Sequence, residues 1–256
     1  MQNALLIGLS RQIALNRELE VVANNIANIE TTGYKSDGAM FEEFLMPLAS
    51  ASGFQGNDRR LSYVQDRATW HNFSIGPLRP TGNPLDVAID GDAFFVVQTD
   101  RGERYTRNGS FQINANGELV TTSGDRVLGD GGPIQFQATD SKVSINPDGT
   151  ITVQESGLST SDAARGKLRM VRFDNLQRLR KDGASMFAAP NGVTPTDPSA
   201  NTRVIQGSLE GSNVRPVLEM ARMVEVTRTY TQIAGLLQQH GDIRRSSIEK
   251  LAEIPA

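Results

Sequence analysis

A helical sequence pattern ends within the stretch Ala23-Asn24-Asn25-Ile26-Ala27-Asn28-Ile29-Glu30-Thr31-Thr32-Gly33-Tyr34-Lys35. Upstream of it, residues 4–28 contain no Pro, and Gly8 alone interrupts the helix formers. Asn and Gly tolerate turn and left-handed conformations, so we expect the helix to stop here and an extended arm to follow. The apolar residues of the helix recur at helical spacing, with one shift of phase: Leu5, Leu9, Ile13, then Leu15, Leu19, Val22 and Ile26.

A second helical pattern lies near the C-terminal end. Pro216 suits the first position of a helix, and Asn213 is a candidate cap. Two apolar stripes follow, which predicts contacts with more than one neighbour, although on periodicity alone two core helices of an ordinary domain also fit. The first stripe steps 3, 4, 3, 4 through Met223, Val226, Tyr230, Ile233 and Leu237. The flanking stripe is Val217, Met220, Val224, Thr227, Thr231 and Ala234.

The region between the two helical patterns is typical of β structure. Turn dipeptides such as Asn108-Gly109, Asn116-Gly117 and Asp148-Gly149 separate its short β-rich runs, a pattern that predicts local antiparallel hairpins. The runs are Val87–Ile89, Phe94–Val97, Phe111–Ile113, Glu118–Val120, Val143–Ile145, Thr150–Val153 and Lys167–Phe173.

These patterns predict an α+β fold in which the N- and C-terminal helices pair into one module and an antiparallel β domain is inserted between them. The helical module is expected at residues 1–30 plus 215–256 and the β domain at 76–205. Extended connecting arms, 31–75 plus 206–214, would join the two.

The composition excludes several classes of protein. The 256 residues have a formal net charge of −3 and include no Cys, which rules out disulfides, thiolate metal ligands and a Cys nucleophile. Such a charge offers no global basic field for nucleic acid or an anionic membrane. No stretch approaches the roughly 18–20 apolar residues of a membrane span. Met1–Gln12 has no basic residue ahead of its apolar stretch, so we expect no cleaved signal peptide.

Patterns for catalysis are weak along the whole chain. His71 and His240 have no second His or Cys at the spacing of metal ligands. Asp86, Asp90 and Asp92 form a small acidic group without the spacing of a calcium loop. We therefore expect no catalytic residue, metal, cofactor or small-molecule substrate. The alternative from another functional class is a monomeric β-rich binding protein or hydrolase that uses these three Asp side chains.

A basic cluster follows the predicted hairpins, with Asp174 as its local acid. Phe173 is its one aromatic residue, whereas single-stranded nucleic acid calls for several stacking aromatics. We expect a solvated strand face or a patch that meets an acidic neighbouring subunit. The cluster comprises Arg165, Lys167, Arg169, Arg172, Arg178, Arg180 and Lys181.

The opening stretch has the pattern A-N-N-x-A-N-x-x-T-x-G-[FY]-K and closely resembles the N-terminal motif of the bacterial flagellar axial proteins, which are the rod, hook and hook-associated subunits. The resemblance touches nearly the whole chain. It continues through Asn83–Phe95 and Tyr105–Phe111, similar to the β region of rod and hook proteins, and resumes at Gln206–Val214. Within the family, Asn3–Gln12 is most similar to the proximal rod subunit. The distal rod subunit shares the β motifs and is the alternative.

The resemblance implies a structural subunit of the periplasmic rod. Its terminal helices would polymerise with other copies and other rod proteins into a tubular shaft that transmits torque around the export channel. The flagellar type III export apparatus would export it with an uncleaved N-terminus. The implied assembly interface is Leu5, Leu9, Ile13, Leu19, Val22, Ile26, Met223, Val226, Tyr230, Ile233 and Leu237. The motif residues that stop the helix are Asn24, Asn25, Asn28, Thr31, Gly33, Tyr34 and Lys35, of which Tyr34 and Lys35 would anchor the turn against a neighbour.

Overall fold

The computed structural model describes residues 2–47, 60–155, 163–183 and 185–252. The chain divides into two compact units, and both of its ends belong to the first one. The helical unit comprises Met1–Ala27, Asp37–Trp70 and Arg215–Ala256, and the β unit comprises Asn28–Ser36 and His71–Val214. The chain therefore passes between the units at four places: 27/28, 36/37, 70/71 and 214/215.

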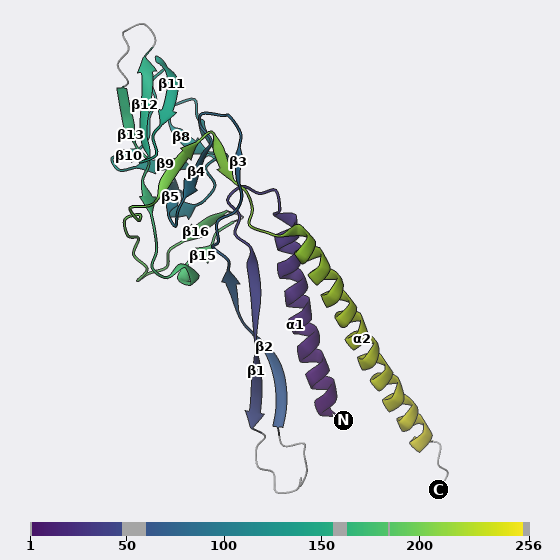
Figure 1. Ribbon diagram of the computed structural model, residues 1–256. Helices are drawn as coiled ribbons and strands as arrows, with labels where there is room; N and C mark the ends of the chain where they lie inside the picture. Colours follow the sequence, from purple (N-terminus) through teal and green to yellow (C-terminus); the bar gives the residue numbers. More distant parts are fainter. Residues whose placement is uncertain (1, 48–59, 156–162, 184, 253–256) are drawn as a thin grey trace. The chain divides into compact units, whose positions relative to one another are not determined.

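The helical unit contains two long helices, α1 (Gln2–Ala27) and α2 (Pro216–Ala252), which lie side by side and run in opposite directions (Figure 1). Pro216 is the first helical residue, where its missing N–H costs nothing. The expectation that Asn213 caps α2 is wrong, because its side-chain oxygen accepts a hydrogen bond from the Ser36 N–H at 2.8 Å and its amide group donates to the Asn72 carbonyl. Neither described helix is long and apolar enough to cross a bilayer.

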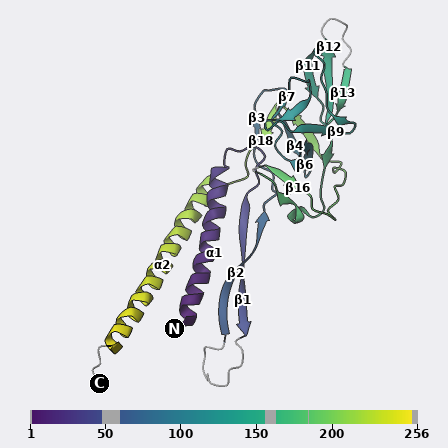
Figure 2. The same cartoon turned by 180° about the vertical axis from the view of Figure 1, so that it is seen from behind.

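A two-stranded ribbon completes the helical unit. Strands β1 (Asp37–Pro47) and β2 (Arg60–His71) pair with each other, and β1 runs along α1 (Figure 2). The Asn25 amide on α1 exchanges two hydrogen bonds with the Asp37 backbone, at 2.8 and 2.9 Å, and so fixes the start of β1. Much of the segment expected to be an extended arm is therefore a paired ribbon packed on a helix.

The β unit is a set of antiparallel pairs, and with the two terminal helices it confirms the α+β fold. Its principal sheet has the order β15-β16-β6-β5-β9-β8-β7, with β10 added to β9 and β14 to β5. Smaller sheets are β11-β12-β13, β17-β4 and β18-β3. A short 3-10 helix, η2, covers Leu176–Arg178. The strands are β3 (Leu78–Pro80), β4 (Val87–Asp90), β5 (Phe94–Thr99), β6 (Gly102–Thr106), β7 (Phe111–Ile113), β8 (Leu119–Thr121), β9 (Arg126–Gly129), β10 (Gly132–Pro133), β11 (Asp140–Ile145), β12 (Thr150–Glu155), β13 (Ala163–Lys167), β14 (Met170–Val171), β15 (Arg180–Lys181), β16 (Met186–Ala188), β17 (Arg203–Gln206) and β18 (Ser208–Glu210).

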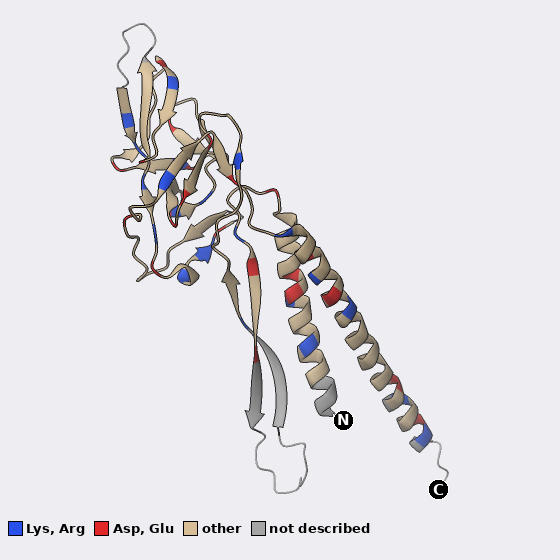
Figure 3. Ribbon diagram, in the orientation of Figure 1, with Lys and Arg blue, Asp and Glu red and all other residues tan. Residues whose placement is uncertain are grey.

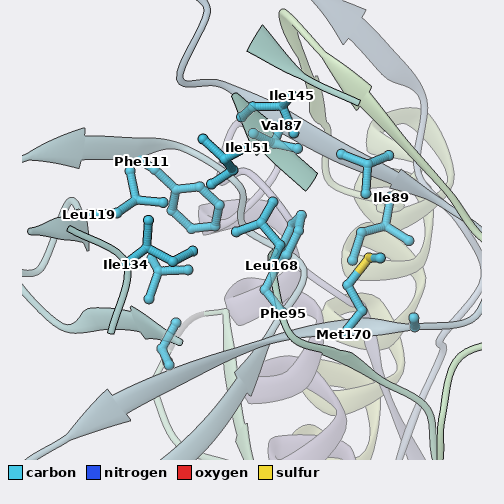
Figure 4. Packing of buried hydrophobic residues seen from close by; sticks show 14 of the residues in the cluster. Val87, Ile89, Phe95, Phe111, Leu119, Ile134, Ile145, Ile151, Leu168 and Met170 are labelled. Carbon is cyan, nitrogen blue, oxygen red and sulfur yellow. The ribbon is translucent and has the colours of Figure 1, made fainter. Parts of the chain in front are cut away.

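Strand β5 lies between two apolar cores. Successive side chains of a strand point to opposite faces of its sheet. Phe95 and Val97 accordingly join one cluster, whereas Phe94 and Val96 join another. The first cluster, shown in Figure 4, is filled from distant strands and loops by Val87, Ile89, Phe111, Leu119, Ile134, Ile145, Ile151, Leu168 and Met170 among others. The second is rich in edge-to-face rings, including Phe173 and Phe187.

Candidate assembly surface

The predicted interface residues of α1 separate into two groups. Val22 is buried, and Leu19 and Ile26 are half-buried, within the unit that also contains α2 and the ribbon. Leu9 and Ile13 are exposed, Ile13 by 62 %. The side chain of Leu5 lies outside the described part of the structure. The second half of α1 thus contributes to packing within the chain, while Leu9 and Ile13 in its first half remain accessible.

The predicted seam of α2 is also divided. Val226 is 5 % exposed, and Tyr230, Ile233 and Leu237 are half-buried, whereas Met223 remains exposed. Leu237 packs so closely on Gly8 of α1 that a Cβ atom at Gly8 would lie 2.6 Å from the Leu237 Cδ2 atom. This seam therefore serves mainly to pair the two helices of one chain.

The flanking stripe of α2 carries further apolar surface that the chain itself leaves open. Val217, Met220 and Val224, which we call the outward stripe, are all more than half exposed, Val224 by 69 %. Further apolar side chains are exposed along the same helix: Leu218, Leu236, Ile243 and Ile248. Exposed apolar patches of this kind mark sites of protein–protein contact.

Polar contacts fix the pairing of the helices near the start of α2. Arg222 Nε donates a hydrogen bond to Glu18 Oε1 at 2.8 Å, and its Nη2 atom forms an ion pair with the same oxygen at 2.8 Å. Asn25 donates to Glu219 at 3.4 Å. Arg222 lies off both apolar stripes in the sequence pattern, so this pair between distant residues has no local signal. The two helices are thus joined by ionic as well as apolar contacts.

The motif residues lie at the boundary between the two units. Asn24 and Asn25 lie in the last turn of α1, which ends at Ala27. Asn28 begins the segment Asn28–Ser36, called here the motif segment, which belongs to the β unit. The Thr31 hydroxyl donates to the Asn28 side chain at 3.1 Å. Gly33 has a φ of +67°, and a Cβ atom there would lie 2.4 Å from the Asn108 backbone nitrogen. This turn therefore requires glycine for its conformation and for its closeness to a second loop.

Tyr34 and Lys35 are fully buried in the β unit of their own chain. The Lys181 ammonium lies 3.8 Å from the centre of the Tyr34 ring and donates a hydrogen bond to the Lys35 carbonyl at 3.1 Å. Their expected role as anchors against a neighbour is replaced by anchoring within the chain, because the folded β unit already surrounds both side chains.

Lys35 belongs to a cluster of three buried charges with Glu210 and Arg107, named here the buried charge triad. Glu210 accepts hydrogen bonds from the Lys35 ammonium at 2.5 Å, from the Gly76 N–H at 2.9 Å and from Arg107 at 3.4 Å. Burial lowers the pKa of both the Lys35 amine and the Arg107 guanidinium, and Glu210 opposes both shifts. Sequence reasoning missed Glu210 and Arg107, although both lie in blocks that resemble the family.

Part of the basic cluster is paired with acids that are distant in the sequence. Arg165 forms two hydrogen bonds with Asp140, which lowers the pKa of that carboxyl group, and Arg169 pairs with Glu103 at 2.8 Å. Blue and red positions both occur throughout the β unit in Figure 3. Arg165 and Arg169 therefore already have carboxylate partners, and a meeting of the rest of the cluster with an acidic neighbouring subunit stays a prediction.

The acidic group considered for catalysis is structural where its contacts are described. Asp86 is buried and accepts hydrogen bonds from Thr81 at 2.7 Å and Asn83 at 3.0 Å, which shapes the turn before β4. Asp92 accepts from Ser199 at 3.2 Å. Across the described residues, no group of three or more His, Cys, Asp or Glu side chains is arranged to hold a metal ion.

An assembly role suits this geometry, since the surface that the chain leaves open is apolar and helical. Family models match three regions: "Flagella basal body rod protein" residues 5–35, "Flagellar hook protein FlgE/F/G D1 domain" residues 88–153, and "Flagellar basal body rod FlgEFG protein C-terminal" residues 205–249. These regions correspond to α1 with most of the motif segment, the middle of the β unit, and β17 through most of α2.

Curated relatives align over nearly the whole chain. The flagellar basal-body rod protein FlgF of Caulobacter vibrioides is 39 % identical over 99 % of this chain and 100 % of its own length. FlgF of Mesorhizobium japonicum is 33 % identical over 98 % of both chains, and the rod protein FlgG of Bacillus subtilis is 28 % identical over 95 % of this chain and 97 % of its own. This chain belongs to the flagellar basal-body rod protein family, a family of structural proteins that form part of the flagellar basal body.

Proposed function

We propose that this chain is a rod subunit that polymerises through its terminal helices, with further copies of itself and with other rod proteins as partners. The outward stripe of α2 is the observation that carries the proposal, because the chain's own α1 and ribbon leave Val217, Met220 and Val224 exposed. Burial of apolar surface is worth about 25 cal/mol per Å². A helical array repeats that gain at every subunit.

Several finer features of the role belong to the same proposal. The subunit would occupy the proximal rod, because Asn3–Gln12 is most similar to the proximal rod subunit. The distal rod is the alternative. It would form part of a periplasmic tube that transmits torque and surrounds the export channel. Export would use the flagellar type III apparatus without cleavage of the N-terminus. The role requires no catalysis, cofactor, small-molecule substrate or nucleic acid.

A charge in the outward stripe tests the proposal. Val224→Asp is expected to abolish motility and intact rods in cells, because a carboxylate would enter an apolar interface where the Val side chain is worth about 1.5 kcal/mol per subunit. The purified variant is expected to keep the helix content and thermal unfolding of the wild type, since Val224 is exposed in the single chain. Motility and basal-body content are the measurements, alongside circular dichroism of the purified protein.

The matched control is Gln239→Asp, which adds the same charge at an exposed polar position of α2. It is expected to swim normally. Normal motility of Val224→Asp would contradict the assembly surface and favour a monomeric binding protein instead.

A further inference from the structure

The buried charge triad joins three segments that lie far apart in the sequence. Lys35 lies in the motif segment, Arg107 follows β6, and Glu210 ends β18 near the C-terminal boundary of the β unit. The partners are separated by 175 residues for Lys35 and Glu210 and by 103 residues for Arg107 and Glu210. The triad therefore exists only when both ends of the β unit's sequence are in place.

Glu210 is the one negative charge of the triad, so its loss would leave two buried positive charges and no negative one. Among the described residues, its carboxylate is the acid that bonds to both cations, and its side chain is fully buried. The charge of Asp92 also acts on Arg107. Lys35 has one further acceptor, the Ser74 carbonyl at 2.7 Å, and Arg107 has the Gly91 carbonyl at 2.8 Å. Neutral carbonyls do not offset the cost of burying a full positive charge. Loss of Glu210 would thus leave two buried cations without a counterion in the triad.

The backbone around Glu210 also holds the motif segment. The Gly33 N–H donates to the Glu210 carbonyl at 2.8 Å. Three residues later, Asn213 accepts from the Ser36 N–H at 2.8 Å and donates to the Asn72 carbonyl at 2.7 Å. Residues 210–213 thus contact the motif segment through both main-chain and side-chain atoms.

We propose that Glu210 controls the docking of the motif segment, so that residues 28–36 are held on the β unit only after the strand that ends at Glu210 has joined its sheet. The N-terminal and C-terminal boundaries of the β unit then form one cooperative element. A chain in which β18 is missing or misplaced exposes Lys35. The proposal concerns the single chain and does not depend on polymerisation.

Trypsin provides a direct test in the full-length protein, because Lys35 is a cleavage site only when it is exposed. The wild type is expected to resist cleavage after Lys35 while exposed basic sites are cut. Glu210→Gln keeps the size of the side chain and removes its charge. We expect this variant to be cleaved after Lys35 at least about tenfold faster, since a buried hydrogen bond to a charged group is lost. Hydrogen exchange of the Gly33 amide should accelerate in parallel.

Two further variants separate the proposal from a general loss of packing. Glu30→Gln removes an exposed partner of Arg79 in the same segment and should leave the cleavage rate after Lys35 unchanged. Lys35→Met combined with Glu210→Gln removes one of the two uncompensated cations, so Gly33 should exchange more slowly than in Glu210→Gln alone.

Three outcomes would overturn the proposal. The first is wild-type resistance of Lys35 in Glu210→Gln. The second is simple addition of the Lys35→Met and Glu210→Gln effects on Gly33 exchange. The third is loss of protection at Ile151 and Val153, in the core strand β12, to the same extent as at Gly33, because that would show unfolding of the whole unit and not release of one segment.

Discussion

The residues of the motif segment differ in what they contribute, even though all belong to one short pattern. Gly33 supplies a left-handed turn against the Asn108 backbone, and Tyr34 and Lys35 fill the interior behind it. Glu30, in the same segment, forms only an exposed pair with Arg79. The pattern therefore specifies a folded junction within the chain, and its glycine is the position with the least freedom.

Gly33→Ala is expected to destabilise the β unit by about 3 kcal/mol, because it combines a left-handed backbone with a backbone clash at 2.4 Å. Denaturant unfolding of the purified protein measures the effect. Gly82→Ala is the matched control, since Gly82 also has a positive φ, of +76°, but has no atom within 4 Å of an added Cβ. That variant should lose about 1 kcal/mol. Equal losses in the two variants would show that the close approach to Asn108 is unimportant.

The part of the site that could be predicted at this scale is local. The sequence indicates that Asn28 and Gly33 stop a helix, because that signal comes from the conformational preferences of these residues and does not require a distant partner. The partner of Lys35 could not be predicted, since Glu210 is 175 residues away and a single sequence contains no signal for that pairing. The ion pair of Arg222 with Glu18 was missed for the same reason.

At the scale of elements, α2 has two apolar faces, of which one is packed and the other is exposed. The face that includes Val226 packs within the helical unit, and the face that includes Val224 remains open. The sequence showed both stripes but not which of them α1 covers. Strands β4, β5, β7 and β12 begin at the predicted residues, because Asx-Gly turns bound them locally. The expected local hairpin is wrong for β4, which pairs with the distant β17. The ribbon of β1 and β2 was missed, since residues 48–59 lie between its strands in place of a two-residue turn.

Val226→Asp is expected to separate the helices of the isolated chain, in contrast to Val224→Asp. It places an unpaired carboxylate where the wild-type side chain is 5 % exposed, a loss of about 3 kcal/mol from helix pairing. The helical circular dichroism signal should fall, because an isolated helix with a polar substitution in its packing face is marginal in water. Unfolding of the β unit, followed by hydrogen exchange at Val153, should not change. An unaltered helical signal would mean that Val226 is not needed for the pairing.

At the scale of the whole molecule, both chain ends lie in the helical unit, and the motif segment belongs to the β unit. The family pattern therefore crosses the boundary at Ala27–Asn28. Its first residues belong to the helical unit and its later residues to the β unit. A truncation on either side of the motif segment should have very different effects.

Deletion of residues 2–27 is expected to leave thermal unfolding of the β unit close to that of the wild type, while deletion of residues 2–36 lowers its midpoint by about 10 °C. The longer deletion removes Tyr34 and Lys35, which are fully buried in that unit. Neither variant should assemble into rods, because both lack α1. Calorimetry of the purified variants is the measurement. A large loss of stability in the shorter deletion would show that α1 is part of the same core.

The four passages of the chain between its units have a mechanical consequence. Two folded units joined by a single linker can rotate about it, and that linker alone bears any tension between them. Here the tension is shared by the four segments of chain that pass between the units. Rotation of one unit against the other twists these four segments together, which resists further rotation. Under the proposed role in a torque-transmitting rod, a subunit tethered in this way would carry its β unit around with its helical unit.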